Sequence, residues 1–271
     1  MKKNENKFLL RIISASLVIF IGFVSVFAKE RIRNNQPKSI PRLIAHAGGD
    51  INGMNMTNSR QALDQSYSEG FRYIELDISM TSDGVPFLVH DWNNGKFLLK
   101  KNDIRNPPTY KEISSCKTVM NLELLDLARL AQWLKKHKNV YIITDIKDDN
   151  LKVLQLIKVN YPAIVDKIIP QIYKFEEYEP VKNMGYDNII LTLYRMRVTD
   201  EEVVSFCQNN SLFGLTVSSQ RANQEFLKKL SVLKIPVYAH TINEYSVYKK
   251  LRQSGVYGVY TDYFQPDKWD E

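Results

Sequence analysis

Apolar and polar positions along this chain follow two periods, one typical of strands and the other of helices. After residue 41, short apolar runs alternate with longer segments in which apolar residues recur every three or four positions. The runs predict eight strands: Leu43–Ala47, Tyr73–Ser79, Val140–Ile146, Ile168–Ile172, Ile189–Tyr194, Leu212–Val217, Pro236–Thr241 and Tyr257–Thr261. The longer segments predict helices that include Ser59–Ser68, Leu122–Lys136, Leu151–Val159, Glu201–Gln208, Asn223–Leu233 and Glu244–Gln253.

This alternation indicates the fold class. Eight strands that alternate strictly with helices favour a (β/α)₈ TIM barrel over an open doubly wound sheet. Gly70, Gly185 and Gly255 stand where helices should end, each just before the next strand. No glycine-rich phosphate loop follows the first strand, which argues against a dinucleotide fold. We expect one barrel domain over residues 41–271.

Two segments interrupt the regular pattern after the second strand. Pro86–Asp91 is an extra extended segment that follows the turn signal Ser82–Gly84. Trp92–Val119 has no clean periodicity and contains a Pro-Pro pair. We interpret this stretch as an irregular insertion over the mouth of the barrel, where insertions are tolerated.

Composition and charge exclude several classes of protein. An apolar fraction of 44% and a charged fraction of 25% are ordinary for a globular domain and argue against disorder or a coiled coil. Seven Lys or Arg and two Glu within residues 1–33 supply +5 of the net charge of +7, so the remaining residues carry only +2. The charge therefore indicates membrane targeting, and we expect no nucleic-acid partner.

The first 28 residues have the pattern of a leader. Basic residues precede a weakly polar to apolar stretch, Ile12–Ala28, which ends in a small-residue sequence typical of a cleavage site. A signal peptide and an N-terminal membrane anchor both fit residues 1–28, and residues 29–40 form a polar linker. Either alternative places the domain outside the cytoplasm, secreted or anchored to the membrane. Cys116 and Cys207 could pair there, although two unpaired thiols are the simpler interpretation.

Polar residues gather where the predicted strands end, which is where TIM barrels place their active sites. Side chains two residues apart on a strand share a face, so Glu75 and Asp77 should point together. The residues at these ends are His46, Glu75, Asp77, Asp145, Lys147 and His240, and His90 ends the extra extended segment. Tyr173, Tyr194 and Tyr238 lie in or next to strands, and the sequence leaves open which of them reach the mouth.

Three carboxylates predict a site for a hard cation. Buried acids are costly unless they pair or bind an ion. Oxygen donors suit Mg²⁺ or Ca²⁺ better than Zn²⁺, which favours histidine and thiolate. A salt-bridged cluster of Glu75, Asp77 and Lys147 without a metal is the alternative.

Seven short motifs follow one another along the chain: His46-Ala-Gly, Glu75-Leu-Asp77, Thr81-Ser-Asp-Gly84, His90-Asp91, Asp145-Ile-Lys147, Thr241-Ile-Asn243 and Thr261-Asp262. In this order they resemble the motifs of the glycerophosphodiester phosphodiesterase family, within the phosphatidylinositol-specific phospholipase C-like superfamily. The resemblance runs from about Arg42 to Asp262 and so covers essentially the whole domain.

The resemblance implies roles for individual residues. It implies a divalent metal, Mg²⁺ or Ca²⁺, on Glu75, Asp77 and Asp145. It implies that His46 and His90 form a general acid/base pair, which suits histidine near neutral pH. Lys147 and Asn58 are expected to bind substrate. His240 is also a candidate for substrate binding, with a structural hydrogen bond as the alternative. The resemblance further implies that a neighbouring hydroxyl of the substrate attacks first and gives a cyclic phosphate.

Four positions depart from the family pattern. Ala47 replaces an Arg, Thr57 replaces a Glu, His240 replaces a Trp and Asp145 replaces a Glu. These changes surround the phosphate and alcohol pockets and leave the metal and histidine residues in place. We therefore expect the hydrolytic core to be retained and the preferred substrate to differ from plain glycerophosphodiesters.

Three hypotheses about function follow. The first is a metal-dependent phosphodiesterase that acts on a glycerophosphodiester or phospholipid-derived diester. The second is metal-independent cleavage of phosphatidylinositol by the same fold. The third is a degenerate barrel that binds a lipid head group without turnover. In each case the partner is a small phosphodiester or a lipid head group, with possible membrane association through the N-terminal segment.

Overall fold

The computed structural model describes residues 40–93, 98–100 and 105–269. The leader expected over residues 1–28 and the linker up to residue 39 lie outside this part of the chain. Eight strands form the centre of the domain: β1 (Leu43–Ala45), β2 (Tyr73–Met80), β4 (Tyr141–Ile146), β5 (Ile168–Ile172), β6 (Ile190–Thr192), β7 (Gly214–Val217), β8 (Val237–Ala239) and β9 (Gly258–Thr261).

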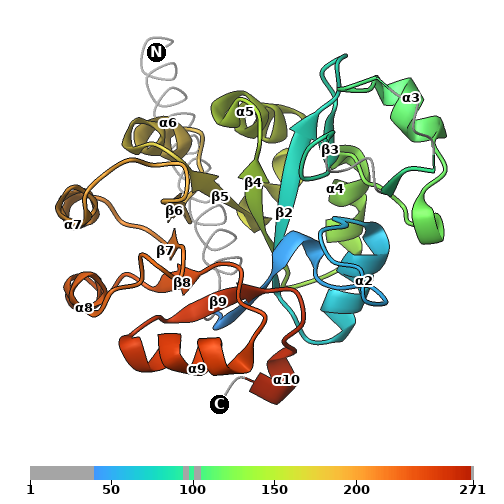
Figure 1. Cartoon of the computed structure of the whole chain (residues 1–271). Coiled ribbons are helices and arrows are strands. Elements are labelled where there is room, and N and C mark those ends of the chain that lie inside the picture. The colour runs from blue at the N-terminus through green and yellow to red at the C-terminus, as the bar shows by residue number, and fades with distance from the viewer. Residues whose placement is uncertain (1–39, 94–97, 101–104, 270–271) are drawn as a thin grey trace, which may run out of the picture. The chain divides into compact units, whose positions relative to one another are not determined.

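These strands close into a ring. They pair in parallel in the order β1-β9-β8-β7-β6-β5-β4-β2, and a further pairing between β1 and β2 completes the circle. Figure 1 shows the ring with its helices on the outside. The (β/α)₈ barrel predicted from the sequence is therefore confirmed.

The helices are α2 (Arg60–Ser68), α3 (Tyr110–Ser115), α4 (Leu127–Lys136), α5 (Asn150–Asn160), α6 (Tyr178–Asn183), α7 (Asp200–Asn209), α8 (Gln224–Val232), α9 (Tyr245–Ser254) and α10 (Pro266–Trp269). Most of them cover the outer surface of the ring, whereas α3 belongs to the insertion after the second strand (Figure 1). The side chain of Asp126 accepts the backbone N–H of Arg129 and caps α4, so this helix begins at Leu127 and not at Leu122 as predicted. The pattern missed α3, α6 and α10, because such short helices show no clear period.

The barrel has two apolar layers. One fills the interior of the ring and consists of Ile44, Tyr73, Ile143, Ile169, Ile190, Tyr238 and Tyr260. The other, larger layer lies between the strands and the helices. The ring of Tyr238 presses against Gly214 and Gly258, where an added Cβ would come within 3.0 Å and 2.8 Å of it. Glycine at these two positions lets a large side chain occupy the interior.

The insertion after the second strand forms a small unit of its own. β3 (Pro86–Leu88) pairs antiparallel with β2, and α3 follows it beside the ring (Figure 1). Its own core consists of Phe87, Val89, Trp92, Leu98, Leu99, Ile113, Leu122 and Leu124. Trp92 Nε1 donates to the carbonyl oxygen of Met80 at 2.6 Å and thereby attaches this unit to the end of β2.

Two further observations concern the cysteines and the helices. Cys116 is half-buried, Cys207 is buried, and both are free thiols. Within residues 40–269, apart from the two short gaps, no helix combines the length and the apolar character that crossing a bilayer requires.

Candidate active site

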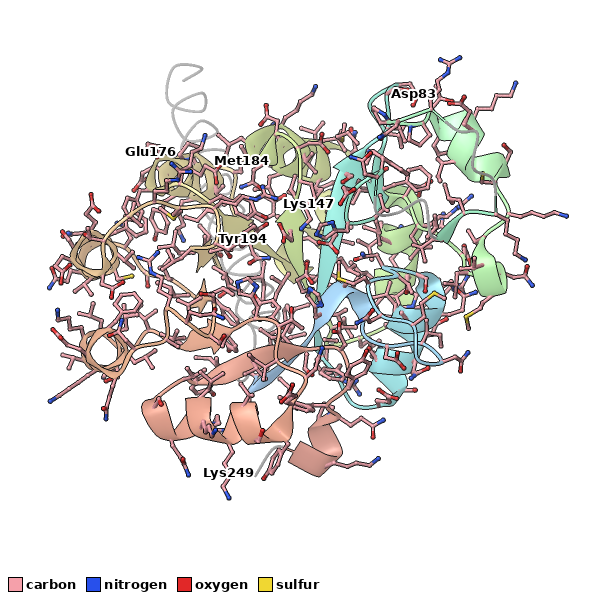
Figure 2. All side chains as sticks on the ribbon, in the orientation of Figure 1. Asp83, Lys147, Glu176, Met184, Tyr194 and Lys249 are labelled. Atoms are coloured by element: carbon pink, nitrogen blue, oxygen red, sulfur yellow. The ribbon has the colours of Figure 1, made fainter. Side chains whose placement is uncertain are left out.

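The polar residues of the barrel mouth continue the inner faces of the strands. On β2, the interior residue Tyr73 is followed at two-residue steps by Glu75 and Asp77. On β4, Ile143 is followed in the same way by Asp145 and then by Lys147, just beyond the strand. Figure 2 shows Lys147 and Tyr194 near the centre of the ring, whereas Asp83, Glu176, Met184 and Lys249 lie at its periphery.

Three carboxylates meet at the ends of β2 and β4. Glu75, Asp77 and Asp145 each offer an oxygen within 4.8 Å of the others, and all three residues are buried. The parallel register places Asp77 directly beside Asp145. Glu75 Oε2 accepts the backbone N–H of Ala47 at 2.8 Å, whereas its buried Oε1 has no hydrogen-bond partner among the described residues. Burial, and then repulsion from Asp77, raises the pKa of Glu75 to about 8.

This donor set fits a hard divalent cation. An unpartnered buried carboxylate oxygen is unfavourable, and a cation among the three oxygens would satisfy it. The clustered ligands are carboxylates alone, which Mg²⁺ and Ca²⁺ prefer. The metal prediction therefore has a physical basis beyond the resemblance.

Asp77 is held from two sides. Asn58 Nδ2 donates to Asp77 Oδ2 at 2.9 Å, and Asn58 Oδ1 accepts the backbone N–H of Asp77 at 2.9 Å. Lys147 Nζ lies 2.7 Å from Asp77 Oδ1 and 2.8 Å from Asp145 Oδ2. Burial acts to lower the pKa of Lys147, but Asp77 and Asp145 raise it above its ordinary value. The structure thus places two residues predicted to bind substrate, Asn58 and Lys147, against the carboxylate cluster.

Asp145 is anchored by the neighbouring strands. Tyr173 Oη donates to Asp145 Oδ1 at 2.6 Å, and Tyr194 Oη lies 3.0 Å from both carboxylate oxygens. Burial acts to raise the pKa of Asp145, but Lys147, the hydrogen bond from Tyr173 and the charge of Arg195 lower it. Tyr173 and Tyr194 therefore reach the mouth, whereas Tyr238 lies in the apolar interior and donates to the carbonyl oxygen of Pro41 at 2.8 Å.

His46 pairs with a carboxylate from the last strand of the barrel. His46 Nδ1 lies 2.9 Å from Asp262 Oδ1. Asn243 and Asn55 each donate to Asp262 Oδ2, at 2.7 Å and 3.2 Å. Burial acts to lower the pKa of His46, but Asp262 and Glu75 outweigh it and raise the value to about 9.

Asp262 and Asn243 were quoted in the family motifs, but sequence reasoning gave them no role. The signal was available: a closed barrel brings the last strand beside the first, and Asp262 continues the inner face of β9 from Tyr260.

The other two histidines predicted for the site, His90 and His240, have different surroundings. His90 Nδ1 lies 2.6 Å from Asp91 Oδ2, and its side chain is 34% exposed. Ser79, on the inner face of β2, donates to the backbone oxygen of His90 at 3.1 Å and so positions it beyond Asp77. His240 is half-buried, with Nε2 lacking a hydrogen-bond partner among the described residues. Burial, and then the positive charge of His46, lowers the pKa of His240 to about 4.

A cleft opens beside the carboxylate cluster at the ends of β4, β5 and β6. It has a volume of about 730 Å³, and Tyr173, Phe175, Glu176, Arg195 and Met196 are among the residues that line it. Tyr173 and Arg195 also contact Asp145, so the cleft adjoins the cluster directly. Sequence reasoning did not identify Arg195.

The chain was compared with known sequences and structures. Glycerophosphodiester phosphodiesterase 1 of Rattus norvegicus is 36% identical over 75 residues, which cover 28% of this chain and 22% of the rat protein. The match thus spans only about a fifth of that relative.

Two solved structures share the fold. A glycerophosphoryl diester phosphodiesterase from Parabacteroides distasonis is 15% identical and covers 86% of this chain and 87% of its own, with a TM-score of 0.65. An Oleispira antarctica phosphodiesterase, in complex with the product sn-glycerol-3-phosphate, is 16% identical and covers 83% and 94%, with a TM-score of 0.60. The model of one family matches residues 46–265, which include the acids and histidines of the site. The chain belongs to the glycerophosphoryl diester phosphodiesterase family.

Proposed function

We propose that this chain is a divalent-metal-dependent phosphodiesterase that hydrolyses a glycerophosphodiester or a phospholipid-derived diester. The observation that carries this proposal is the buried cluster of Glu75, Asp77 and Asp145, with its unpartnered oxygen, next to the His46–Asp262 pair. The glycerol phosphate bound to the Oleispira antarctica relative supports a small substrate with that group.

The carboxylates are the residues that would hold the cation. Bound there, it would withdraw charge from the phosphoryl oxygens of the substrate. Asn58 keeps Asp77 in place through both ends of its amide, and Tyr173 fixes the orientation of Asp145. Lys147 offsets part of the negative charge of the cluster from within the barrel.

The histidines are suited to move protons in opposite directions. Because Asp262 accepts from His46 Nδ1, Nε2 is the nitrogen left to exchange a proton. The raised pKa keeps His46 protonated at neutral pH, so we assign it as the acid that protonates the leaving alcohol. His90, at the more open edge, is assigned as the base that takes a proton from the attacking hydroxyl of the substrate. The P–O bond to the leaving alcohol then breaks as the new P–O bond forms, which gives a cyclic phosphate. Water opens this ring in a second step, in which the two histidines exchange the roles of acid and base, so both return to their starting protonation states.

The first experiment tests the metal. Protein stripped with a chelator should hydrolyse no glycerophosphodiester, and Mg²⁺, Ca²⁺ or Mn²⁺ should restore turnover. Undiminished hydrolysis in excess chelator would contradict the proposal and favour metal-independent cleavage. If the protein hydrolyses none of a broad panel of diesters but binds glycerol phosphate measurably, a non-catalytic barrel is favoured.

A second experiment tests the two histidine roles. His46→Ala and His90→Ala should each abolish hydrolysis of a diester with an alkyl leaving group, with unchanged circular dichroism. A p-nitrophenyl leaving group needs no protonation, so it should restore much of the activity of H46A and little of that of H90A. The opposite pattern would exchange the two assignments, and full activity in either variant would remove that histidine from the mechanism.

A further inference from the structure

The charges at the site do not balance once a phosphodiester enters. The three ionised carboxylates are matched by a divalent cation and Lys147, and the His46–Asp262 ion pair is neutral. A phosphodiester adds one negative charge, and charge builds further on its oxygens in the transition state. A second side-chain cation is therefore needed near the cluster. Among the described residues, only Lys147 and Arg195 place a side-chain cation within 4.0 Å of these carboxylates.

We infer that Arg195 binds the phosphoryl oxygens of the substrate, from the β6 side of the barrel mouth. This inference rests on the proposed function of the site. Arg195 Nη2 lies 3.7 Å from Asp145 Oδ1, which is close enough for a shared electrostatic field but too long for a direct hydrogen bond. The guanidinium therefore interacts electrostatically with the cluster but donates no hydrogen bond to Asp145.

The guanidinium is held in place before any substrate arrives. Its Nη1 donates to the carbonyl oxygen of Ile146 at 3.1 Å. Its central carbon lies 4.3 Å from the ring centroid of Tyr173 and 5.2 Å from that of Tyr194. Both tyrosines also contact Asp145, so the same two rings fix the carboxylate and the cation relative to each other. This rigidity reduces the entropy cost of binding an anion.

The guanidinium also remains accessible. The side chain of Arg195 is 32% exposed and lines the cleft that adjoins Asp145. The group has five N–H donors, and the bond to Ile146 uses one of them. A planar pair of the remaining donors matches two phosphoryl oxygens, which is the bidentate geometry that arginine favours.

Matched variants test this inference in the metal-loaded protein. Loss of a charged hydrogen bond in Arg195→Gln should lower kcat/KM about 10- to 100-fold, and weaken inhibition by sn-glycerol 3-phosphate similarly. Arg195→Lys keeps the charge but not the planar pair of donors, so it should fall in between. Lys249→Gln removes one positive charge from an exposed side chain on α9, at the periphery of the ring (Figure 2), and should change kcat/KM less than about twofold.

A metal titration without substrate separates substrate binding from support of Asp145. Removal of a neighbouring positive charge should leave the affinity for Mg²⁺ or Ca²⁺ unchanged or slightly higher in R195Q. A parallel loss of metal affinity and activity would mean that Arg195 holds Asp145, and would overturn the inference. Equal effects of R195Q and K249Q would overturn it as well.

The test also distinguishes this inference from the proposed function. If the wild type hydrolyses no diester with any cation, the proposed function fails. Calorimetric binding of sn-glycerol 3-phosphate to the wild type and R195Q then still decides the role of Arg195: weaker binding to R195Q supports it, and equal binding refutes it.

Discussion

Side chains at alternate positions of the strands point into the barrel at both of its ends. Burial favours the side chains at one end and is unfavourable for the ionised side chains at the other. Toward the N-terminal ends of the strands the interior is apolar, and residues such as Tyr73, Ile143 and Tyr238 are at most 5% exposed. Two residues further along the same strands lie Glu75 and Asp145, which are also buried but carry carboxyl groups. Burial stabilises the first group and opposes the ionisation of the second. The apolar end therefore supplies the rigidity that holds an unfavourable cluster of charges together.

The largest effect is expected at the charged end, for Glu75→Gln. This variant lacks the ligand oxygen that the structure leaves unpartnered, so hydrolysis should fall on the order of 10³-fold. Its stability should change in the opposite direction. The folded-state pKa of Glu75 is about 8 against an ordinary value of 4.5. The stability of the metal-free wild type should therefore fall as pH rises from about 4.5 to about 8. E75Q has no carboxyl group to ionise at this position, so it should not lose stability in this way.

Chemical denaturation in chelator at pH 4 and pH 8 measures the difference. At pH 4 the two proteins should have similar free energies of unfolding, and at pH 8 E75Q should be more stable by about 4 kcal/mol. Saturating Mg²⁺ or Ca²⁺ at pH 8 should stabilise the wild type by about 2–3 kcal/mol and E75Q by much less. If the metal-free wild type is as stable as E75Q at pH 8, ionisation of Glu75 does not destabilise the folded protein, which would contradict this prediction.

Tyr238→Ala should cause the largest loss of stability at the apolar end. Tyr238 is fully buried, and its ring fills the space that Gly214 and Gly258 leave open. Truncation should lower the free energy of unfolding by about 3–4 kcal/mol, because the surrounding strands close the cavity only in part.

The conservative variant Tyr238→Phe separates packing from hydrogen bonding. It removes only the hydrogen bond to Pro41 and should cost about 1 kcal/mol. In both Tyr238 variants the folded fraction should retain its metal affinity. A lower metal affinity in Y238A, with unchanged stability, would mean that the two ends of the interior are not separable in this way.

The sequence predicted those parts of the site that lie on one strand. Because side chains on a strand alternate, the positions of Glu75 and Asp77 on a common face followed from their spacing alone. The barrel followed from the strict order of strands and helices. Contacts between strands were harder to predict, since they depend on how far each side chain reaches across the closed ring. Tyr173 and Tyr194 converge on Asp145 from β5 and β6, and the sequence left their direction open.

Helix capping and local backbone conformation determine other features of the structure, which the period of apolar residues does not show. Leu122 to Leu125 looked like the first turn of α4, but Asp126 caps the helix after them, and Leu124 bridges to Ser59. Asn58 was assigned to the substrate because of its place in a motif. Its positive φ of 49° turns its amide onto Asp77, and no periodic pattern shows that geometry.

The smallest expected effect concerns Asn243, which touches neither the carboxylate cluster nor His46. Asn243 Nδ2 donates to Asp262 Oδ2 at 2.7 Å, and its Oδ1 accepts the backbone N–H of Asp262 at 2.9 Å. Asn243→Ala should let the carboxylate turn away from His46 and lower kcat about tenfold, with little change in KM. The pKa of His46 should then move from about 9 back toward its ordinary 6.5, so the acid form is depleted above neutral pH. The loss should therefore be larger at pH 8 than at pH 6. Asn55→Ala removes a longer contact of 3.2 Å with the same oxygen and is the matched control, with an expected loss of about two- to threefold. A loss in N243A that is equal at both pH values would mean that Asn243 supports the loop and not the protonation state of His46.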